Sequence, residues 1–234
     1  MAPLKAVLLD AGGTLIHPDH TFILDLLARE GVEAVEEDYD RARRAADAAV
    51  GDILRSDDPG TDQTRIRAWF GRLLLSLGLP ESRLEAVGRE IRRRHEEGRL
   101  WVRTVPGTRE VLQGLRADGL RLAVISNADG RVATYLEHAG LADLFELIVD
   151  SGLEGVEKPD PAIFRTALEQ LGVEPGEAVY VGDTWPVDVV GARRAGIDPI
   201  YLAADHGTDG DLDGVPRITG IHELPEALGT RKGT

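Results

Sequence analysis

Close to the start of the chain stands Val7-Leu8-Leu9-Asp10-Ala11-Gly12-Gly13-Thr14-Leu15, a short apolar run that ends on a carboxylate and is followed by two glycines. An apolar run of this length bounded by glycines is typical of a strand buried on both faces of a parallel sheet. Asp10 then lies at the carboxyl end of that strand, where open α/β sheets bind their ligands. The glycines allow the backbone to approach whatever the carboxylate acts on. The stretch therefore predicts an α/β fold with Asp10 at its functional edge.

Composition excludes several classes of protein. The chain has 234 residues, 42% of them hydrophobic, which suits one substantial domain or one domain with an insertion. It has no cysteine, so disulfides, thiolate nucleophiles and cysteine-bound metals are excluded. The formal net charge of −14 argues against a nucleic-acid partner. For an anionic substrate, positive charge must come from a metal ion or a placed side chain.

The start of the chain and its hydropathy predict a cytoplasmic location. No apolar run approaches the roughly 18 residues that a membrane span needs. The segment from Met1 to Lys5 lacks the layout of a signal peptide. We therefore expect a soluble protein without a membrane partner, whose oligomeric state the sequence does not indicate.

Two patterns of periodicity divide the chain. Residues 17–100 show helical spacing of apolar residues, with breaks at glycines and prolines, and predict helices at Phe22–Ala28, Val35–Val50, Thr64–Leu77 and Glu81–Glu97. From residue 101 the pattern alternates between helices and strands. It predicts helices at Thr108–Ala117, Gly130–Ala139, Pro161–Leu171, Val187–Ala195 and Leu224–Leu228, and strands at Leu120–Ile125, Leu147–Val149, Ala178–Val181, Pro199–Leu202 and Arg217–Ile218.

This alternation predicts a parallel, Rossmann-like sheet covered by helices on both faces. The sheet domain then comprises residues 1–16 and 101–234, and residues 17–100 form an all-helical insertion. Asp205 to Gly214, rich in glycine and aspartate, is expected to be a solvated loop.

Polar residues follow three of the predicted strands. Asp10, Ser126-Asn127 and Asp183 stand at carboxyl ends, which lie along one edge of a parallel sheet. Asp188 begins the next helix, and Lys158 precedes another. Carboxylates can act as nucleophiles and hold Mg²⁺, and hydroxyl, amide and ammonium groups can stabilise phosphoryl oxygens. This set of side chains favours phosphoryl chemistry.

Each of these residues also has a structural interpretation. Ser126-Asn127 can cap a helix, Asp183 can sit in a turn, and Asp188 can complement a helix dipole. Lys158 can be a surface residue, although it is one of only three lysines in the chain. All of these structural interpretations would have to hold at once, for residues that occur in this order along the chain, which makes the functional interpretation the better one.

In this order, the segments resemble the four motifs of the haloacid dehalogenase (HAD) superfamily. The four segments are Asp10-Ala11-Gly12-Gly13-Thr14-Leu15, Ile125-Ser126-Asn127, Lys158-Pro159 and Gly182-Asp183-Thr184-Trp185-Pro186-Val187-Asp188. The helical insertion is similar in position to the C1-type cap of that family. The resemblance implies a phosphatase-like branch with a Rossmann-like core.

The resemblance also implies roles for individual residues. Asp10 would be the nucleophile that becomes an aspartyl-phosphate, with Ser126 and Lys158 as its catalytic partners. The implied substrate-binding residues are Ser126, Asn127, Lys158 and Thr14. The implied Mg²⁺ ligands are Asp10, Asp183, Asp188 and the backbone carbonyl of Gly12. The implied function is Mg²⁺-dependent hydrolysis of a small phosphorylated metabolite.

Gly12 departs from the family pattern. Phosphatases of this family carry a second aspartate at this position, which protonates the leaving oxygen and activates water. His17, Asp19 and His20 are the nearest candidate substitutes, although hinge and capping roles suit them better. An alternative hypothesis is a degenerate member that binds Mg²⁺ or a phosphorylated ligand without turnover.

Two other branches of the family also lack the second aspartate at the position of Gly12, and each fails on another feature. The dehalogenase branch needs no metal, which the pair Asp183 and Asp188 argues against. The phosphonatase branch uses a lysine of the cap, and residues 17–100 contain no lysine.

Overall fold

The computed structural model describes residues 3–58, 60–203 and 214–229. The chain forms two compact units, Met1–His17 with Val102–Thr234, and Pro18–Trp101. The predicted loop from Asp205 to Gly214 lies, except for its last residue, outside the described residues. Among the residues described, no helix combines the length and the apolar character required to span a membrane.

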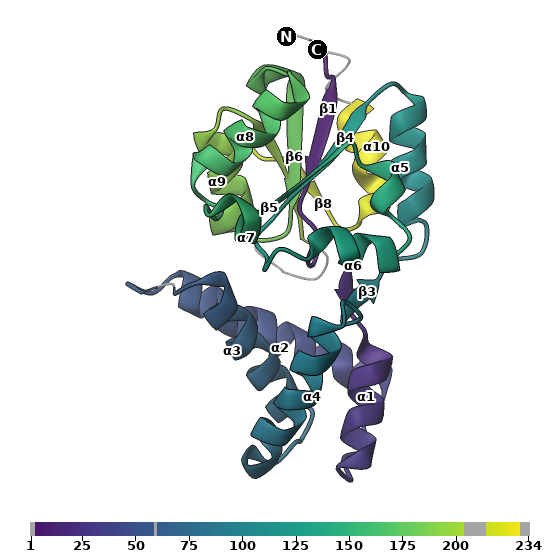
Figure 1. The fold of residues 1–234 in the computed structure, drawn as a ribbon, viewed down its shortest axis with the longest axis vertical. Coiled ribbons are helices and arrows are strands. Elements are labelled where there is room, and N and C mark those ends of the chain that lie inside the picture. Colours follow the sequence, from purple (N-terminus) through teal and green to yellow (C-terminus); the bar gives the residue numbers. More distant parts are fainter. Residues whose placement is uncertain (1–2, 59, 204–213, 230–234) are drawn as a thin grey trace. The chain divides into compact units, whose positions relative to one another are not determined.

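A six-stranded sheet forms the centre of the first unit (Figure 1). Its neighbouring strands are all parallel, in the order β5-β4-β1-β6-β7-β8. The strands are β1 (Ala6–Leu9), β4 (Arg121–Ser126), β5 (Leu147–Asp150), β6 (Ala178–Gly182), β7 (Asp198–Leu202) and β8 (Arg217–Ile218). The predicted α/β class and parallel sheet are confirmed.

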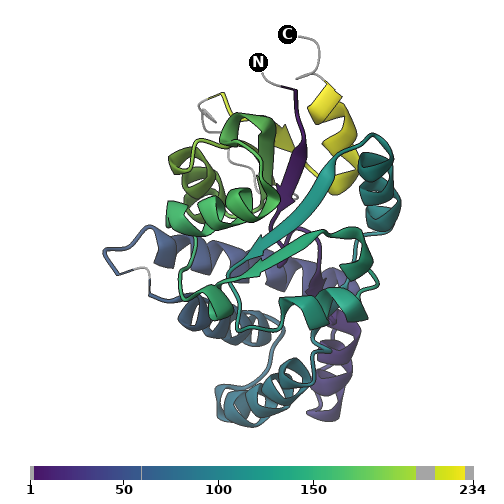
Figure 2. The same cartoon turned by 45° about the horizontal axis from the view of Figure 1, so that its top comes forward.

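Helices cover both faces of this sheet (Figures 1 and 2). On one face lie α8 and α9, and on the other lie α5 and α10. The helices of the unit are α5 (Thr108–Ala117), α6 (Val132–His138), α7 (Ser151–Glu154), α8 (Pro161–Leu171), α9 (Val190–Arg194) and α10 (Leu224–Gly229).

Local sequence sets the ends of α8. The Asp160 side chain caps its first turn by accepting a hydrogen bond from the backbone N–H of Ala162, and Pro161 occupies the first helical position. Gly172 ends the helix in a left-handed conformation with φ 62°. These signals explain why the predicted bounds of this helix match the observed ones.

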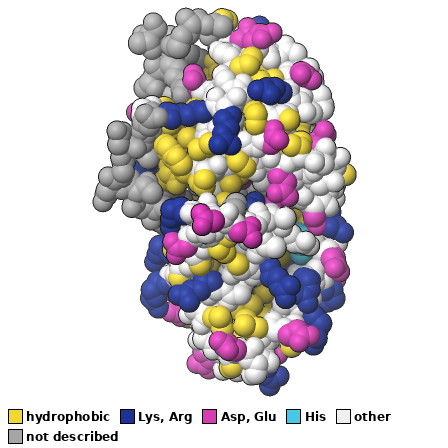
Figure 3. All heavy atoms as spheres, turned by 90° about the vertical axis from the view of Figure 1, so that its left-hand side faces the viewer, with side chains coloured by type: hydrophobic (Ala, Val, Ile, Leu, Met, Phe, Trp, Pro, Cys, Tyr) yellow, Lys and Arg dark blue, Asp and Glu magenta, His cyan; other side chains and the backbone are white. Residues whose placement is uncertain are grey.

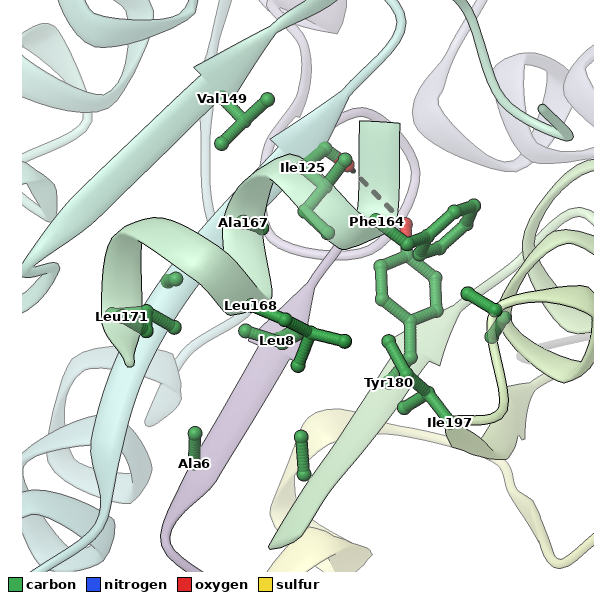
Figure 4. Close-up of a cluster of buried hydrophobic side chains, with 14 of the residues drawn as sticks. Ala6, Leu8, Ile125, Val149, Phe164, Ala167, Leu168, Leu171, Tyr180 and Ile197 are labelled. Atoms are coloured by element: carbon green, nitrogen blue, oxygen red, sulfur yellow. Dashed lines mark hydrogen bonds between the residues drawn. The ribbon is translucent and has the colours of Figure 1, made fainter. Parts of the chain in front are cut away.

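The core under α8 and α9 contains every second residue of the central strands (Figure 4). Ala6 and Leu8 of β1 pack there with Ile125 of β4 and Tyr180 of β6. All four residues of β1 are buried, because helices cover both faces of this central strand. Burial of each large aliphatic side chain contributes about 1.5–3 kcal/mol to the free energy of unfolding. Because β1 is held firmly in this core, Asp10, which follows it directly, has a fixed position.

Helices make up most of the second unit. They are α1 (His20–Arg29), α2 (Glu36–Leu54), α3 (Asp62–Ser76) and α4 (Leu84–Glu96). Its core is a cluster of leucines with Ile23, Tyr39, Phe70 and Ile91. The sequence missed a two-stranded sheet formed by β2 (His17–Pro18) and β3 (Trp101–Arg103), because strands of two and three residues carry no periodic signal.

Arginines of the helical unit pair with nearby carboxylates. The pairs are Arg41–Asp38, Arg43–Asp47, Arg55–Asp52, Arg89–Glu85 and Arg93–Glu97. On the face drawn in Figure 3, basic and acidic side chains are interspersed, with hydrophobic side chains among them. Each of these arginine charges is therefore neutralised by a carboxylate of the same helix or its end.

Candidate active site

The centre of the sheet brings three predicted site segments together. β1 lies between β4 and β6, and Leu9 pairs with Val124 on one side and Val181 on the other. On one side of β1 the chain proceeds outward through β4 and β5, and on the other side it proceeds outward through β6, β7 and β8. The strand order therefore reverses at β1, and open sheets bind ligands at such a switch point. Asp10 follows β1 directly, and its backbone N–H donates to the carbonyl of Val181 at 2.8 Å. Ser126 ends β4 and is buried.

Lys158 lies at the centre of the site, with 3% of its surface exposed. Its Nζ is 2.6 Å from Oδ1 of Asp10 and 2.7 Å from Oδ1 of Asp188. A third hydrogen bond joins Nζ to the hydroxyl of Tyr180 at 2.8 Å. An ammonium has three donors, so every donor of Lys158 is used.

Burial and charge shift the pKa values of this cluster. Burial raises the pKa of Asp10 from 3.8 to about 7, against the lowering effect of the neighbouring Lys158. Burial alone would lower the pKa of Lys158, but Asp10 and Asp188 outweigh it and hold that pKa above its ordinary value. Burial and the adjacent Asp188 raise the pKa of Tyr180 far above 10. Lys158 is therefore a cation and Tyr180 a neutral phenol at physiological pH.

Asp188 is held by contacts on both carboxylate oxygens. Oδ1 lies 2.7 Å from Lys158 Nζ and 2.9 Å from the hydroxyl of Tyr180. Oδ2 accepts the backbone N–H of Thr184 at 2.9 Å. A Cβ on Gly182 would lie 2.4 Å from Cγ of Asp188, so only glycine at the end of β6 lets this carboxylate come so close.

The segment that carries Asp188 is not the regular helix that the sequence predicts from Val187. Trp185–Val189 forms a π-helical turn, and regular α9 begins at Val190. Such turns are frequent at functional sites. The wide turn accommodates the four residues between Asp183 and Asp188 while Asp188 stays buried.

Three carboxylates converge in a group that could hold a metal ion. One oxygen from each of Asp10, Asp183 and Asp188 lies within 4.8 Å of the other two. Hard oxygen donors of this kind suit Mg²⁺. Gly13 closes the group: its φ is +85°, and a Cβ there would lie 2.3 Å from Oδ2 of Asp183. The backbone at Gly13 therefore packs directly against one of the three carboxylates.

We expect Gly13→Ala to destabilise the protein and weaken Mg²⁺ binding, because it adds both left-handed strain and a clash with Asp183. The free energy of unfolding should fall by about 1–3 kcal/mol. Gly31→Ala is the matched control, since Gly31 has φ +78° but a methyl group added there would meet no atom within 4 Å. Urea unfolding and Mg²⁺ calorimetry test both variants. Wild-type Mg²⁺ affinity in Gly13→Ala would contradict the close approach.

The side chain of Asn127 contacts the backbone of Lys158. The side-chain amide of Asn127 donates to the carbonyl of Lys158 at 3.0 Å, and its oxygen accepts the N–H of Lys158 at 2.7 Å. This two-point contact fixes the loop that carries Lys158 to the end of β4. The role of Asn127 that this geometry favours is to position Lys158.

The loop after Ser126 is fixed by the end of β5. The Asp150 carboxylate accepts backbone N–H groups from Gly130, Val132 and Gly152. The neighbouring hydroxyl of Ser151 bonds both backbone groups of Ala128. The sequence did not single out either residue, although Asp150 and Ser151 directly follow the predicted strand Leu147–Val149.

The remaining predicted residues lie as follows. Thr14 is buried, and its hydroxyl is 3.5 Å from Oδ1 of Asp183. Gly12 forms an isolated bridge with Ile16. Each therefore lies in the loop after β1.

Two of the candidate substitutes for the missing second aspartate have partners in the helical unit. Asp19 caps α1 through the N–H of Phe22 and pairs with Arg94 at 3.0 Å. His20 lies 3.4 Å from Glu36. These contacts fit the capping interpretation of Asp19.

Tyr180 is a further site residue that the sequence did not indicate. It lies in the middle of an apolar strand, where its side chain counts as core. The one visible signal was the hydroxyl itself, since a buried tyrosine needs a hydrogen-bond partner. Its position two residues before Gly182 places both on the same face of the strand.

The family model of haloacid dehalogenase-like hydrolases matches residues 4–196. The chain belongs to this family. The family match and the fold confirm the resemblance drawn from the four motifs.

Named relatives include hydrolases and phosphatases. A haloacid dehalogenase-like hydrolase domain-containing protein 3 of Mus musculus is 38% identical over 120 residues, or 51% of this chain and 47% of that protein. The chain therefore matches about half the length of that relative. A phosphoglycolate phosphatase of Rhodospirillum rubrum is 31% identical over 85% of this chain and 79% of its own. The solved HAD phosphatase from Thermococcus onnurineus is 27% identical, with a TM-score of 0.61 over 97% of this chain and 98% of its own.

Proposed function

We propose that this HAD-family protein is a Mg²⁺-dependent phosphatase that acts on a small phosphorylated metabolite through an aspartyl-phosphate at Asp10. The observation that carries the proposal is the buried contact of Lys158 with Asp10 and Asp188, beside the three-carboxylate group. Phosphatases among the relatives support the same reaction class. We also propose that the helical unit, Pro18–Trp101, is the cap that selects the substrate.

In the proposed reaction, an oxygen of Asp10 attacks the phosphorus atom of a bound monoester. The new oxygen–phosphorus bond forms as the bond to the leaving oxygen breaks, and that oxygen takes a proton from water. Water then attacks the phosphorus atom of the aspartyl-phosphate and loses a proton. Inorganic phosphate leaves, and the Asp10 carboxylate is restored.

Residues around Asp10 would bind and orient the phosphoryl group. The positive charge of the Lys158 ammonium would stabilise its oxygens, the Ser126 hydroxyl would donate to them, and Asn127 would fix the loop of Lys158. Thr14 would bind the substrate beside them, with its hydroxyl 3.5 Å from Oδ1 of Asp183. Mg²⁺, held by Asp10, Asp183, Asp188 and the carbonyl of Gly12, would supply positive charge that offsets the phosphoryl oxygens.

Gly12 determines which leaving groups the site handles well. It offers no side chain to protonate a leaving oxygen. Aryl and acyl phosphates need little protonation, so they should be hydrolysed faster than alkyl phosphates. The test is phosphate release from p-nitrophenyl phosphate, acetyl phosphate and glycerol 3-phosphate, each with and without Mg²⁺.

We expect Gly12→Asp to raise kcat for glycerol 3-phosphate by at least about tenfold, because it supplies the missing acid and base. The rate with acetyl phosphate should change much less. Gly12→Asn is the control, since it has the same size without a titratable group. An equal change for both substrates, or an equal gain with Gly12→Asn, would contradict this account.

Gly12 also favours a second candidate, a protein that binds Mg²⁺ or a phosphorylated ligand without turnover. Ligand binding would then raise the unfolding temperature without releasing phosphate. Steady Mg²⁺-dependent release that requires Asp10 excludes this candidate. Ligand-induced stabilisation with no release from any of the three phosphates would favour it.

A further inference from the structure

Tyr180 occupies an unusual place for a core tyrosine. Its ring is fully buried in β6 and packs edge-on against Phe164, with ring centroids 5.0 Å apart (Figure 4). Its hydroxyl contacts Lys158 and Asp188 at the carboxyl edge of the sheet. The ring therefore belongs to the core, and the hydroxyl belongs to the charged cluster.

The protons around this hydroxyl can be assigned by counting donors. Lys158 donates one proton each to Asp10, Asp188 and Tyr180, so the phenol oxygen accepts the third. The phenol then has one proton of its own. It can be donated to Asp188 Oδ1 at 2.9 Å or to the carbonyl of Ile125 at 3.2 Å, of which the carboxylate is closer and charged.

This arrangement leaves Asp188 with one oxygen for further ligands. Oδ1 receives both Lys158 and Tyr180, which fills its two lone-pair directions. Oδ2 receives only Thr184 among the bonds described and keeps one direction open. The phenol thus helps decide which oxygen of Asp188 is available to a metal ion, and it occupies a lysine proton that would otherwise turn to a carboxylate oxygen.

We propose that Tyr180 is a positioning residue of the phosphoryl-transfer site, which holds Lys158 and Asp188 in the orientation that binds Mg²⁺ and faces Asp10. The inference rests on the proposed function for its kinetic part, and on geometry alone for its metal-binding part. Without the hydroxyl, the third proton of Lys158 would be drawn toward the charged carboxylates, where it would compete with the cation. Loss of a partner behind a metal ligand typically costs 10–100-fold in affinity or activity.

Tyr180→Phe tests the proposal, because it removes only the hydroxyl and keeps the packing against Phe164. Tyr135→Phe is the matched control: it removes a hydroxyl from the same unit that donates to Asp129 at 3.1 Å, outside the three-carboxylate group. We expect Tyr180→Phe to weaken Mg²⁺ binding at least about tenfold by calorimetry. We also expect kcat for acetyl phosphate to fall at least about tenfold, with KM changing less. The control should stay within about twofold of wild type in both.

A measurement on the wild-type protein keeps the test independent of the variant's folding. The chain has only three lysines, so ¹⁵N-lysine labelling yields at most three ammonium signals. Lys158 should give a slowly exchanging signal that shows contact with a protected tyrosine hydroxyl proton. A rapidly exchanging tyrosine hydroxyl at this position would overturn the proposal.

The remaining outcomes separate this proposal from the proposed function. If wild type binds Mg²⁺ but releases no phosphate, the phosphatase assignment fails, and the Mg²⁺ affinity of Tyr180→Phe still decides the role of Tyr180. A folded Tyr180→Phe protein with wild-type Mg²⁺ affinity and kcat would overturn the positioning role of Tyr180. Equal losses in Tyr180→Phe and Tyr135→Phe would also overturn it, because they would reflect packing alone.

Discussion

Asp10→Asn is expected to lower Mg²⁺-dependent phosphate release by at least about 1,000-fold, because it removes the nucleophile that forms the covalent intermediate. Asparagine has nearly the same shape, and the backbone N–H of Asp10 is fixed to Val181 in either case. Release from acetyl phosphate, compared with and without Mg²⁺, measures the loss. Acid-quenched wild type should also carry a phosphoryl group on the peptide that contains Asp10. A rate within tenfold of wild type would remove Asp10 from the role of nucleophile.

The control for this experiment is the stability of the variant. The folded-state pKa of Asp10 is raised from 3.8 to about 7, so the metal-free protein loses stability through this group as pH rises across that window. At pH 8 the charged carboxylate lies buried beside Asp188, and asparagine removes this cost. We expect Asp10→Asn without Mg²⁺ to be about 1–2 kcal/mol more stable than wild type at pH 8. Loss of activity then cannot be assigned to unfolding. A less stable variant would show that Lys158 outweighs burial at Asp10.

Elements with local signals were predicted well. The bounds of α5 and α8 were predicted because their capping residues are neighbours in sequence, as at Asp160 and Gly172. The alignment of Asp10, Ser126 and Asp183 followed from the rule that parallel strands end at one edge. These parts of the fold depend on short-range chemistry and on one topological rule.

What the sequence missed depends on contacts between distant residues. The partner of Asn127 is the backbone of Lys158, 31 residues away, and a cap-like asparagine carries no mark of that choice. Tyr180 has the pattern of a core residue, and only the arrival of Lys158 and Asp188 gives its hydroxyl a function. The π-helical turn at Trp185–Val189 reflects how Asp188 is accommodated, which helical periodicity does not reveal.

Lys158→Met is expected to have the largest effect on stability, because it leaves two buried carboxylates without their shared cation. Lys158 contacts Asp10 and Asp188 with 2% of its side chain exposed. Removal of one partner from a buried ion pair typically costs about 3–5 kcal/mol. Lys5→Met is the matched control. Its ammonium pairs with Glu177 at 2.7 Å in the same unit but is 51% exposed, so the loss should be at most about 1 kcal/mol.

The pH dependence of the difference in stability between wild type and Lys158→Met shows whether buried charge or lost packing causes it. The pKa of Lys158 is raised above 10.5 in the folded state, so its contribution is fully present at pH 8 and is lost only as pH rises through that higher value. In Lys158→Met the unpaired carboxylates can escape the cost of burial by binding protons. Denaturant unfolding should therefore show the largest gap between wild type and variant near pH 8, and a smaller gap near pH 5. A gap that is independent of pH would mean that lost packing, and not the buried charges, destabilises the variant.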